Sequence, residues 1–320
     1  MNHLTTITPH LPAHIPSLIE EARTYKVNAR KPHTRRSYAS GWRNFAKWCQ
    51  GNGFAALPAS PATVGLYLAS LASSHTASTI NSRKTAIKHM HLEHGLEHSP
   101  TDHPDVKQIS MGIIKTHGSA QKPKKAITSS ILKRMLEGSP QTPVWVRNRA
   151  LLLLTYIGAF RRSEVVSLCV EDCTFNEQGL AARLVRSKGD KLGAGVTVPI
   201  SRKKDILLCP VAALEHWLRL ADIKEGAIFP ALNKNGEPTK RPLSDQCVAL
   251  IIKEAAALVG LDSSVFSGHS MRRGSATQGI NAGMNPKEVQ NHLRHKSVGM
   301  TMRYIEEAEL FKDNLSEKLL

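Results

Sequence analysis

The stretch RALLLLTYIGAFRRSEVVSL, residues 149–168, decides how the second half of this chain folds. Its first part, RALLLLTYIGAF, is too apolar for a surface helix, so we predict a buried helix over residues 143–159. A short helix is then expected to start near Arg161. On it, Arg161 and Glu164 are i, i+3 neighbours. An exposed ion pair would contribute little to stability, but this pair lies where a core helix ends.

The residues after position 128 mix helical and strand patterns. Residues 180–200 alternate around a Gly-Asp turn, which predicts an antiparallel hairpin with its tip at residues 187–190. Helices are expected at residues 128–138, 210–221, 243–259, 269–282, 285–293 and 297–305. The last residues keep an apolar stripe on one helical side, at Leu310, Phe311, Leu315 and Leu319. This half is therefore predicted to be mainly helical with a small antiparallel β-sheet.

The first part of the chain is predicted to be all-helical, with helices at residues 34–50, 60–73, 76–94 and 104–117. The stretch THGSAQKPKKAIT, residues 116–128, has little to bury and suits an exposed linker. We therefore expect an N-terminal extension over 1–30, a helical domain over 31–117, a linker over 118–127 and a second domain over 128–320.

Charge and composition narrow the class of partner. The 320 residues carry 43 Lys and Arg against 26 Asp and Glu, a formal net charge of +17. A field of this sign favours polyanions, most often nucleic acid, although a generally basic protein would share it. No apolar run approaches the ~20 residues that span a membrane, and no secretory signal is visible. Five scattered cysteines suit reduced thiols, so we expect a cytoplasmic protein.

Several residues of the second half can together act on a phosphodiester. Singly, each has an ordinary explanation as a solvated basic residue, a turn lysine or a core tyrosine. Together, arginines can hold phosphate oxygens and histidines can donate hydrogen bonds or move a proton. A hairpin lysine can protonate a leaving oxygen, and a tyrosine hydroxyl can attack phosphorus. The candidate catalytic residues are Arg161, Lys188, His269, Arg272, His295 and Tyr304.

This ordered set resembles the tyrosine recombinases, also called the phage integrase family. GAFRRSEVVSL (158–168) looks like the family's first arginine motif, SKGDK (187–191) looks like its hairpin-lysine motif, and SGHSMRRGSA (267–276) is close to the Cre-like form. The gaps of 22 residues from Arg272 to His295 and eight from His295 to Tyr304 are typical of the family. RSYASGWRNFAKWCQGNG (36–53) and STINSRKTAIKHMHLEHG (78–95) are similar to two helices of the Cre-like core-binding domain. The resemblance implies an all-helical core-binding domain followed by an α+β catalytic domain.

The resemblance also implies site-specific DNA recombination that needs no cofactor, metal or ATP. Tyr304 would attack the scissile phosphate and form a 3′-phosphotyrosyl link. Lys188 would protonate the departing 5′ oxygen. Arg161 and Arg272 would stabilise the transition state with help from His295.

Two further residues would support this reaction. His269 would assist the phosphate and the proton of the nucleophile, and Glu164 would orient Arg161 or the histidines. Strand exchange would pass through a Holliday junction in a homotetramer on double-stranded DNA with inverted repeats. The C-terminal helix 306–320 would be exchanged between subunits. A mobile element or plasmid is the expected setting, by integration or by resolution of cointegrates or dimers, with the protein on the nucleoid when it is bound to DNA.

Three positions depart from the family's pattern. Phe160 replaces the usual leucine, a modest apolar change. Arg294 stands where glycine commonly precedes the histidine, which puts the tightness of the local turn in question and offers an added phosphate contact. Ile305 and Glu306 follow the tyrosine where Thr-His is common. None of these changes removes a catalytic group.

DNA contacts are also expected from the helical domain, through phosphates and a major groove. The candidates, each of which could instead be an ordinary solvated residue, are Arg36, Arg43, Lys47, Ser82, Arg83 and Lys88. A histidine run nearby has zinc-like spacing, but it crosses a helix stop at Gly95 and has no adjacent cysteine, so we predict no metal site. That run holds His89, His91, His94 and His98, with His103 beyond.

Two alternative functions share part of this inventory. A type IB topoisomerase, a DNA-relaxing enzyme, uses most of the same groups, but the Cre-like context of His269 favours a recombinase. A DNA-binding accessory protein would keep the fold without cleavage, and the intact catalytic set argues against it.

Overall fold

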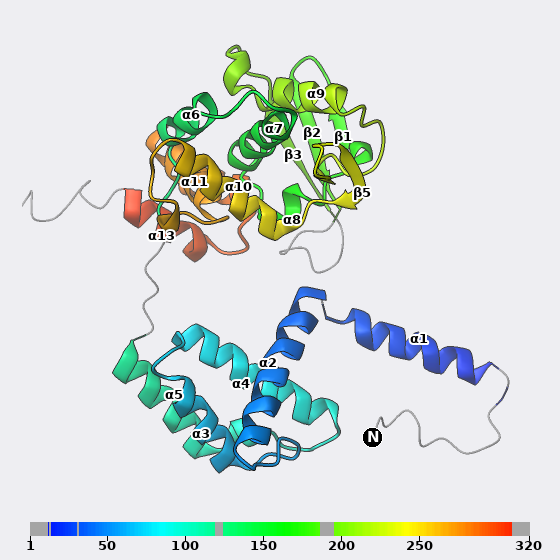
Figure 1. The fold of residues 1–320 in the computed structure, drawn as a ribbon, viewed down its shortest axis with the longest axis vertical. Helices are drawn as coiled ribbons and strands as arrows, with labels where there is room; N and C mark the ends of the chain where they lie inside the picture. Colours follow the sequence, from blue (N-terminus) through cyan, green and yellow to red (C-terminus); the bar gives the residue numbers. More distant parts are fainter. Residues whose placement is uncertain (1–11, 13, 31, 119–123, 186–194, 309–320) are drawn as a thin grey trace, which may run out of the picture. The chain divides into compact units, whose positions relative to one another are not determined.

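The chain divides into two compact units, Met1–Lys122 and Pro123–Leu320, in a computed structural model (Figure 1). The structure describes residues 12, 14–30, 32–118, 124–185 and 195–308. The dividing point falls inside the segment 118–127, which the sequence marks as a linker. No helix in these ranges is long and apolar enough to cross a membrane.

The N-terminal unit is helical wherever it has regular structure. Its elements are α1 (Ile15–Asn28), α2 (Pro32–Gly51), α3 (Pro61–Leu71), α4 (Ala77–Glu93), the 3₁₀ turn η2 (Pro100–Asp102) and α5 (Pro104–His117). The four predicted helices correspond to α2, α3, α4 and α5. The assignment of residues 1–30 as a plain extension overlooked α1, which among its described residues has no buried side chain. Its sequence does carry apolar residues at helical spacing, namely Ile15, Leu18, Ile19 and Ala22, but none of them is buried.

The core of this unit lies where α2, α3 and α4 meet α5. Phe45 and Cys49 of α2 are fully buried, and the Phe45 ring packs edge-on against Tyr67 with centroids 5.0 Å apart. Close approach of α2 to α4 depends on Gly41, because a Cβ there would lie 2.6 Å from the Cβ of Ala86. This packing of α2 leaves its basic residues Arg36, Arg43 and Lys47 exposed.

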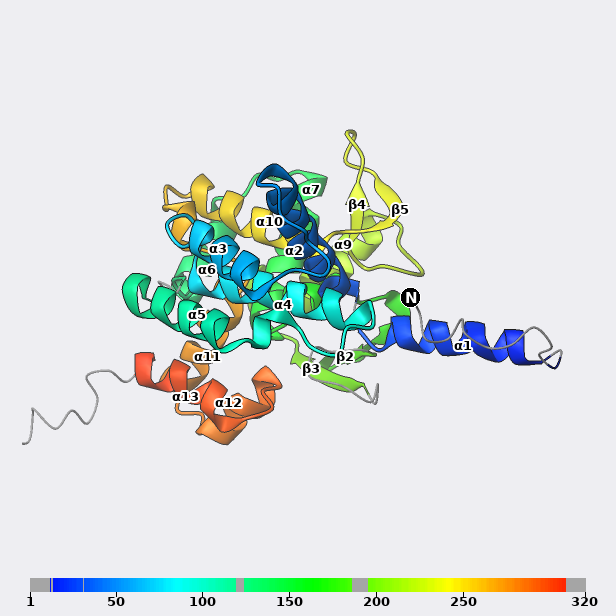
Figure 2. The same cartoon turned by 90° about the horizontal axis from the view of Figure 1, so that it is seen from below.

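The C-terminal unit is mainly helical with two small antiparallel sheets, which confirms the predicted fold class. The helices are α6 (Ser129–Glu137), α7 (Pro143–Ile157), α8 (Arg162–Val165), α9 (Pro210–Leu220), α10 (Asp245–Leu258), α11 (Ser270–Asn281), α12 (Pro286–Leu293) and α13 (Val298–Ala308). Short 3₁₀ turns are η3 (Val170–Asp172), η4 (Ile206–Leu208) and η5 (Ser263–Val265). In Figure 2, α12 and α13 lie together beside α11, and these three helices contact one another.

The sheets are more extensive than the single hairpin that the sequence predicts. The hairpin strands are β2 (Gly179–Leu184) and β3 (Val196–Ser201), and Leu184 pairs with Val196. A third strand, β1 (Cys173–Phe175), pairs with β2, and a second sheet joins β4 (Pro230–Leu232) to β5 (Pro238–Pro242). The predicted hairpin tip, residues 187–190, lies outside the described residues.

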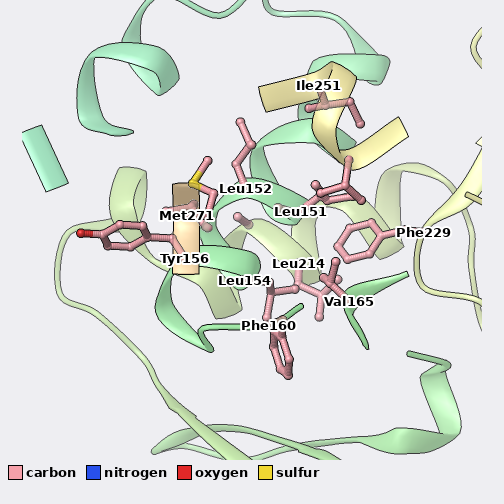
Figure 3. Packing of buried hydrophobic residues seen from close by; sticks show 14 of the residues in the cluster. Leu151, Leu152, Leu154, Tyr156, Phe160, Val165, Leu214, Phe229, Ile251 and Met271 are labelled. Carbon is pink, nitrogen blue, oxygen red and sulfur yellow. The ribbon is translucent and has the colours of Figure 1, made fainter. Parts of the chain in front are cut away.

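Helix α7 forms the centre of the main core, as its sequence predicts. Leu151, Leu152 and Leu154 are completely buried, and residues from α8, α9, α10 and α11 surround them (Figure 3). A separate, smaller apolar cluster contains Ala159, Ala276, Val289 and Leu293, with Ile280 and Tyr304 packed against it. The chain passes between these two clusters just after α7, and the candidate active site forms there.

The first residues of the C-terminal unit lie against α11. The amide of Ile127 donates to the carbonyl of Ser270 at 3.0 Å, and Gly274 makes room for this strand-like segment. A Cβ at Gly274 would lie 1.7 Å from the Ile127 carbonyl oxygen, a backbone atom that cannot rotate away.

We therefore expect Gly274→Ala to lower the free energy of unfolding by about 1–3 kcal/mol, the usual cost of overpacking. Urea denaturation of the full chain measures this cost. Gly299→Ala is the control, because no atom lies within 4 Å of its Cβ position in α13. That variant should be as stable as the wild type or slightly more stable. Equal denaturation midpoints for Gly274→Ala and the wild type would contradict the role of this contact.

Candidate active site

Arg161 and Glu164 form the corner where the buried helix α7 gives way to α8. The Glu164 carboxylate accepts from the Arg161 backbone amide at 2.9 Å and from the Arg161 guanidinium at 2.5 Å. Its side chain is only 2% exposed, that of Arg161 14%. Burial alone would raise the pKa of Glu164, but the hydrogen bonds from Arg161 and the charges of Arg161 and Arg294 outweigh burial and lower it. Glu164 is therefore a carboxylate that orients Arg161.

Arg272 comes to the same corner from α11. Its guanidinium donates to two backbone carbonyls, those of Ala159 and Leu293, and its side chain is buried. Burial, followed by the positive charges of Arg161 and Arg294, lowers the pKa of Arg272 to about 9. Carbonyl acceptors fix the direction of the guanidinium without neutralising its charge. An unneutralised, oriented arginine is suited to a phosphate oxygen.

His295 follows the turn between α12 and α13. Its Nδ1 atom lies 3.0 Å from the hydroxyl of Thr301, a completely buried side chain on α13. Burial first, and then the charges of Arg272, Arg161 and Arg294, lowers the pKa of His295 to about 4. The imidazole is therefore neutral at pH 7, held by one ring nitrogen. Thr301 was missed in the sequence; its only signal was its position one helical turn before Tyr304.

Tyr304 lies on α13 beside this histidine. The two rings stack with centroids 5.8 Å apart and an interplanar angle of 18°, and Tyr304 is partly exposed. The Arg273 guanidinium carbon lies 5.9 Å from the centroid of the Tyr304 ring. The sequence analysis did not single out Arg273, which lies next to Arg272. The structure thus brings Arg161, Arg272, His295 and Tyr304 together from three separate segments.

Of the two remaining candidate catalytic residues, the structure describes only His269. His269 is exposed at the N-cap of α11, one helical turn before Arg272, and its backbone amide donates to the Ser267 hydroxyl at 3.3 Å. It therefore lies at the rim of the corner. Lys188 belongs to residues 186–194, outside the described residues.

Arg294 does not offer the phosphate contact that its position suggested. Its side chain is 10% exposed, and its guanidinium turns inward to the Glu164 carboxylate, 3.2 Å away. The turn itself is kept, since Arg294 adopts the left-handed conformation (φ 54°, ψ 45°) that glycine would favour. Arginine in place of glycine therefore keeps the geometry of the turn, at the cost of backbone strain.

The candidate DNA-contacting residues of the other unit divide into two groups. Arg36, Arg43 and Lys47 form an exposed stripe along α2. On α4, Ser82 is exposed, but the Arg83 guanidinium donates to the Ser40 carbonyl at 3.0 Å. The Lys88 ammonium pairs with Asp102 at 2.8 Å. The stripe on α2 is thus the more available of the two groups.

The histidine run beside them includes a core residue. His91 is fully buried, with Nδ1 hydrogen-bonded to the Ile87 carbonyl at 2.9 Å and Nε2 to the Ala59 amide at 3.0 Å. Both ring nitrogens are hydrogen-bonded, so His91 has a structural role in the core of the helical unit. His89 lies 3.3 Å from Glu93, and His94 bonds the Met90 carbonyl at 2.9 Å.

The lowered pKa of His295 has a consequence for stability. The unfolded histidine, with a pKa near 6.5, binds a proton before the folded one does, so the stabilisation from neutral His295 is complete above pH 6.5 and is lost as pH falls towards 4. Between pH 7 and 4, the wild type should lose at most about 3 kcal/mol more than His295→Asn. Urea unfolding across this range measures the difference. His216→Asn, at an exposed histidine of α9, is the control. Equal losses in wild type and His295→Asn would show that His295 is not held neutral.

Comparison with known proteins identifies the family of the chain. The model of the phage integrase family matches residues 125–310. The integrase/recombinase xerD homolog of Selenomonas ruminantium is 36% identical over 302 residues, 93% of this chain and 89% of that protein. The Cre recombinase of Escherichia phage P1 is 25% identical over 333 residues, 95% of each chain.

A solved structure adds agreement in fold. A lambda integrase dimer bound to a core site superposes with a TM-score of 0.56 at 17% identity, covering 88% of this chain and 93% of that one. Together with the sequence matches over most of the chain, this shows that the protein belongs to the phage integrase family, the tyrosine recombinases.

Proposed function

We propose that this tyrosine recombinase cuts and rejoins double-stranded DNA through a 3′-phosphotyrosyl intermediate on Tyr304. The observation that carries the proposal is the convergence of Arg161, Arg272 and His295 beside the Tyr304 ring. Burial, and then the positive charges of neighbouring arginines, lower the pKa values of Arg272 and His295. A phosphate anion bound among them would relieve that repulsion.

The chemistry follows from the orientation of each group. The Tyr304 hydroxyl oxygen attacks phosphorus while the bond to the 5′ oxygen breaks, and Lys188 supplies the proton for that leaving oxygen. Arg161 and Arg272 hold the non-bridging oxygens as charge develops on them. Neutral His295, with Nδ1 accepting from Thr301, presents Nε2–H to the phosphate. The phosphotyrosyl ester retains the bond energy, so a 5′ hydroxyl can reverse the step without a nucleotide.

DNA as the partner is supported by charge and by relatives. The net charge of +17 favours a polyanion, and the matched lambda integrase structure is of a complex with a core site. The stripe of Arg36, Arg43 and Lys47 on α2 would contact phosphates of the same duplex. On α4, the exposed Ser82 could contact DNA directly, whereas Arg83 and Lys88 would first have to leave Ser40 and Asp102.

Recombination would be completed by a second strand exchange through a Holliday junction in a homotetramer on inverted repeats. The apolar stripe Leu310, Phe311, Leu315 and Leu319 supports a C-terminal helix that packs on a neighbouring subunit. With this chemistry the enzyme would integrate a mobile element, or resolve the cointegrates or dimers of an element or plasmid.

Tyr304→Phe should bind DNA as the wild type does but form no covalent complex. The probe is a duplex enriched from a random library by binding to Tyr304→Phe, then prepared with a nick that traps the cleaved strand. Denaturing gels detect protein-linked DNA. A wild type that binds this duplex without attaching to it would overturn the proposal. Plasmid relaxation without strand exchange would favour the topoisomerase reaction.

Arg43→Gln should weaken binding to all sequences about equally. Loss of one phosphate contact lowers the slope of log affinity against log salt by about 0.9 in magnitude. Fluorescence anisotropy across a salt series measures this slope. Lys107→Gln removes the same charge from an exposed position on α5 and is the matched control. Equal slopes for both variants would remove Arg43 from the DNA interface.

A further inference from the structure

Arg294 occupies a backbone position that does not favour arginine. It caps the C-terminal end of α12 with φ 54° and ψ 45°, a left-handed conformation that side chains other than glycine adopt at a cost. An arginine at this position requires compensation elsewhere in the molecule. The side chain, 10% exposed, supplies it through contacts across the active site.

The Arg294 guanidinium joins two segments that each carry candidate catalytic groups. One terminal nitrogen donates to the carbonyls of His292 at 2.9 Å and Gly158 at 3.0 Å. The other donates to the Ala159 carbonyl at 2.8 Å and to the Glu164 carboxylate at 3.2 Å. These acceptors lie at the end of α12 and at the corner between α7 and α8. The turn that precedes His295 is therefore tied directly to the corner that carries Arg161.

Phe160, which also departs from the family's pattern, contacts the same guanidinium. The Arg294 guanidinium carbon lies 5.3 Å from the centroid of the Phe160 ring, and Phe160 is fully buried. A planar cation at this distance from an aromatic ring is attracted by its electron-rich face. Leucine at position 160 could not provide that attraction. Phe160 and Arg294 thus form one structural unit although 133 positions separate them.

We propose that Arg294, supported by Phe160, is a positioning residue that sets the distance between the Arg161–Glu164 corner and the His295–Tyr304 segment. The assignment rests on the proposed function. Arg294 acts through Glu164 and the backbone of its own turn, and it does not touch the phosphate. Both terminal nitrogens of Arg294 already donate to acceptors on the protein, one of which is the Glu164 carboxylate.

Arg294→Gly provides the sharpest test, because glycine relieves the backbone cost and removes only the guanidinium contacts. With the selected nicked duplex at saturating concentration, we expect the rate of covalent attachment to fall ~10–100-fold, the effect of misplacing reacting groups by about 1 Å. The Kd for DNA should change less than ~2-fold, because no phosphate contact is lost. Arg294→Lys keeps the charge but not the planar fork, so it should also be slowed.

The partnership with Phe160 is tested by combining variants. Phe160→Leu alone should slow attachment by a few-fold, and in the Arg294→Gly background the same change should have less than ~2-fold effect, as expected for coupled neighbours. Circular dichroism and urea unfolding verify that each variant is folded at the assay temperature. If Arg294→Gly fails this check, the comparison of Arg294→Lys with the wild type decides.

Each outcome is distinguishable from failure of the proposed function. A wild type that forms no tyrosine-linked DNA overturns that function and this assignment with it. A wild type that attaches DNA while Arg294→Gly attaches equally fast overturns only the assignment. Parallel losses in rate and DNA affinity would make Arg294 a phosphate ligand, which also overturns it. Additive effects of Phe160→Leu and Arg294→Gly would remove Phe160 from the unit.

Discussion

The buried carboxylate of Glu164 is the interaction on which this site depends. An anion withdrawn from water is tolerated only with partners, and Glu164 has one arginine at the N-cap of its own helix and another in the turn after α12. Each guanidinium is in turn oriented by that shared anion. A single acidic side chain therefore fixes the relative position of two chain segments 130 residues apart.

Backbone carbonyls also orient the guanidinium groups at this corner. The Ala159 carbonyl accepts from both Arg272 and Arg294, and Ala159 itself has a left-handed φ of 45° just after the core helix. Carbonyl dipoles orient cations while leaving their charge largely unpaired. The result is a corner with three arginines and one carboxylate, whose excess positive charge suits a phosphodiester.

Much of this arrangement could be predicted from the sequence because its signals are local. The apolar run of α7 indicated a buried helix, and the resemblance to the tyrosine recombinase motifs selected Arg161, Arg272, His295 and Tyr304. Helix α1 buries no side chain, and the three-residue strands β1 and β4 are too short to show an alternating pattern. The inward direction of Arg294 depends on a distant carboxylate and on backbone dihedral angles, and no local rule contains that information.

The small apolar cluster under Tyr304 is separate from the main core of the C-terminal unit. Arg161 stands against the main core through Phe160 and Val165, whereas Tyr304 rests on the separate cluster around Val289 and Leu293. Local opening requires the least free energy where few apolar side chains are buried. Separating α12 and α13 from α7 would uncover only this small cluster, but it would also break the contacts of Arg294 with Gly158, Ala159 and Glu164. Tyr304 and Arg161 therefore rest on different apolar clusters of the same unit, and the contacts of Arg294 join the two.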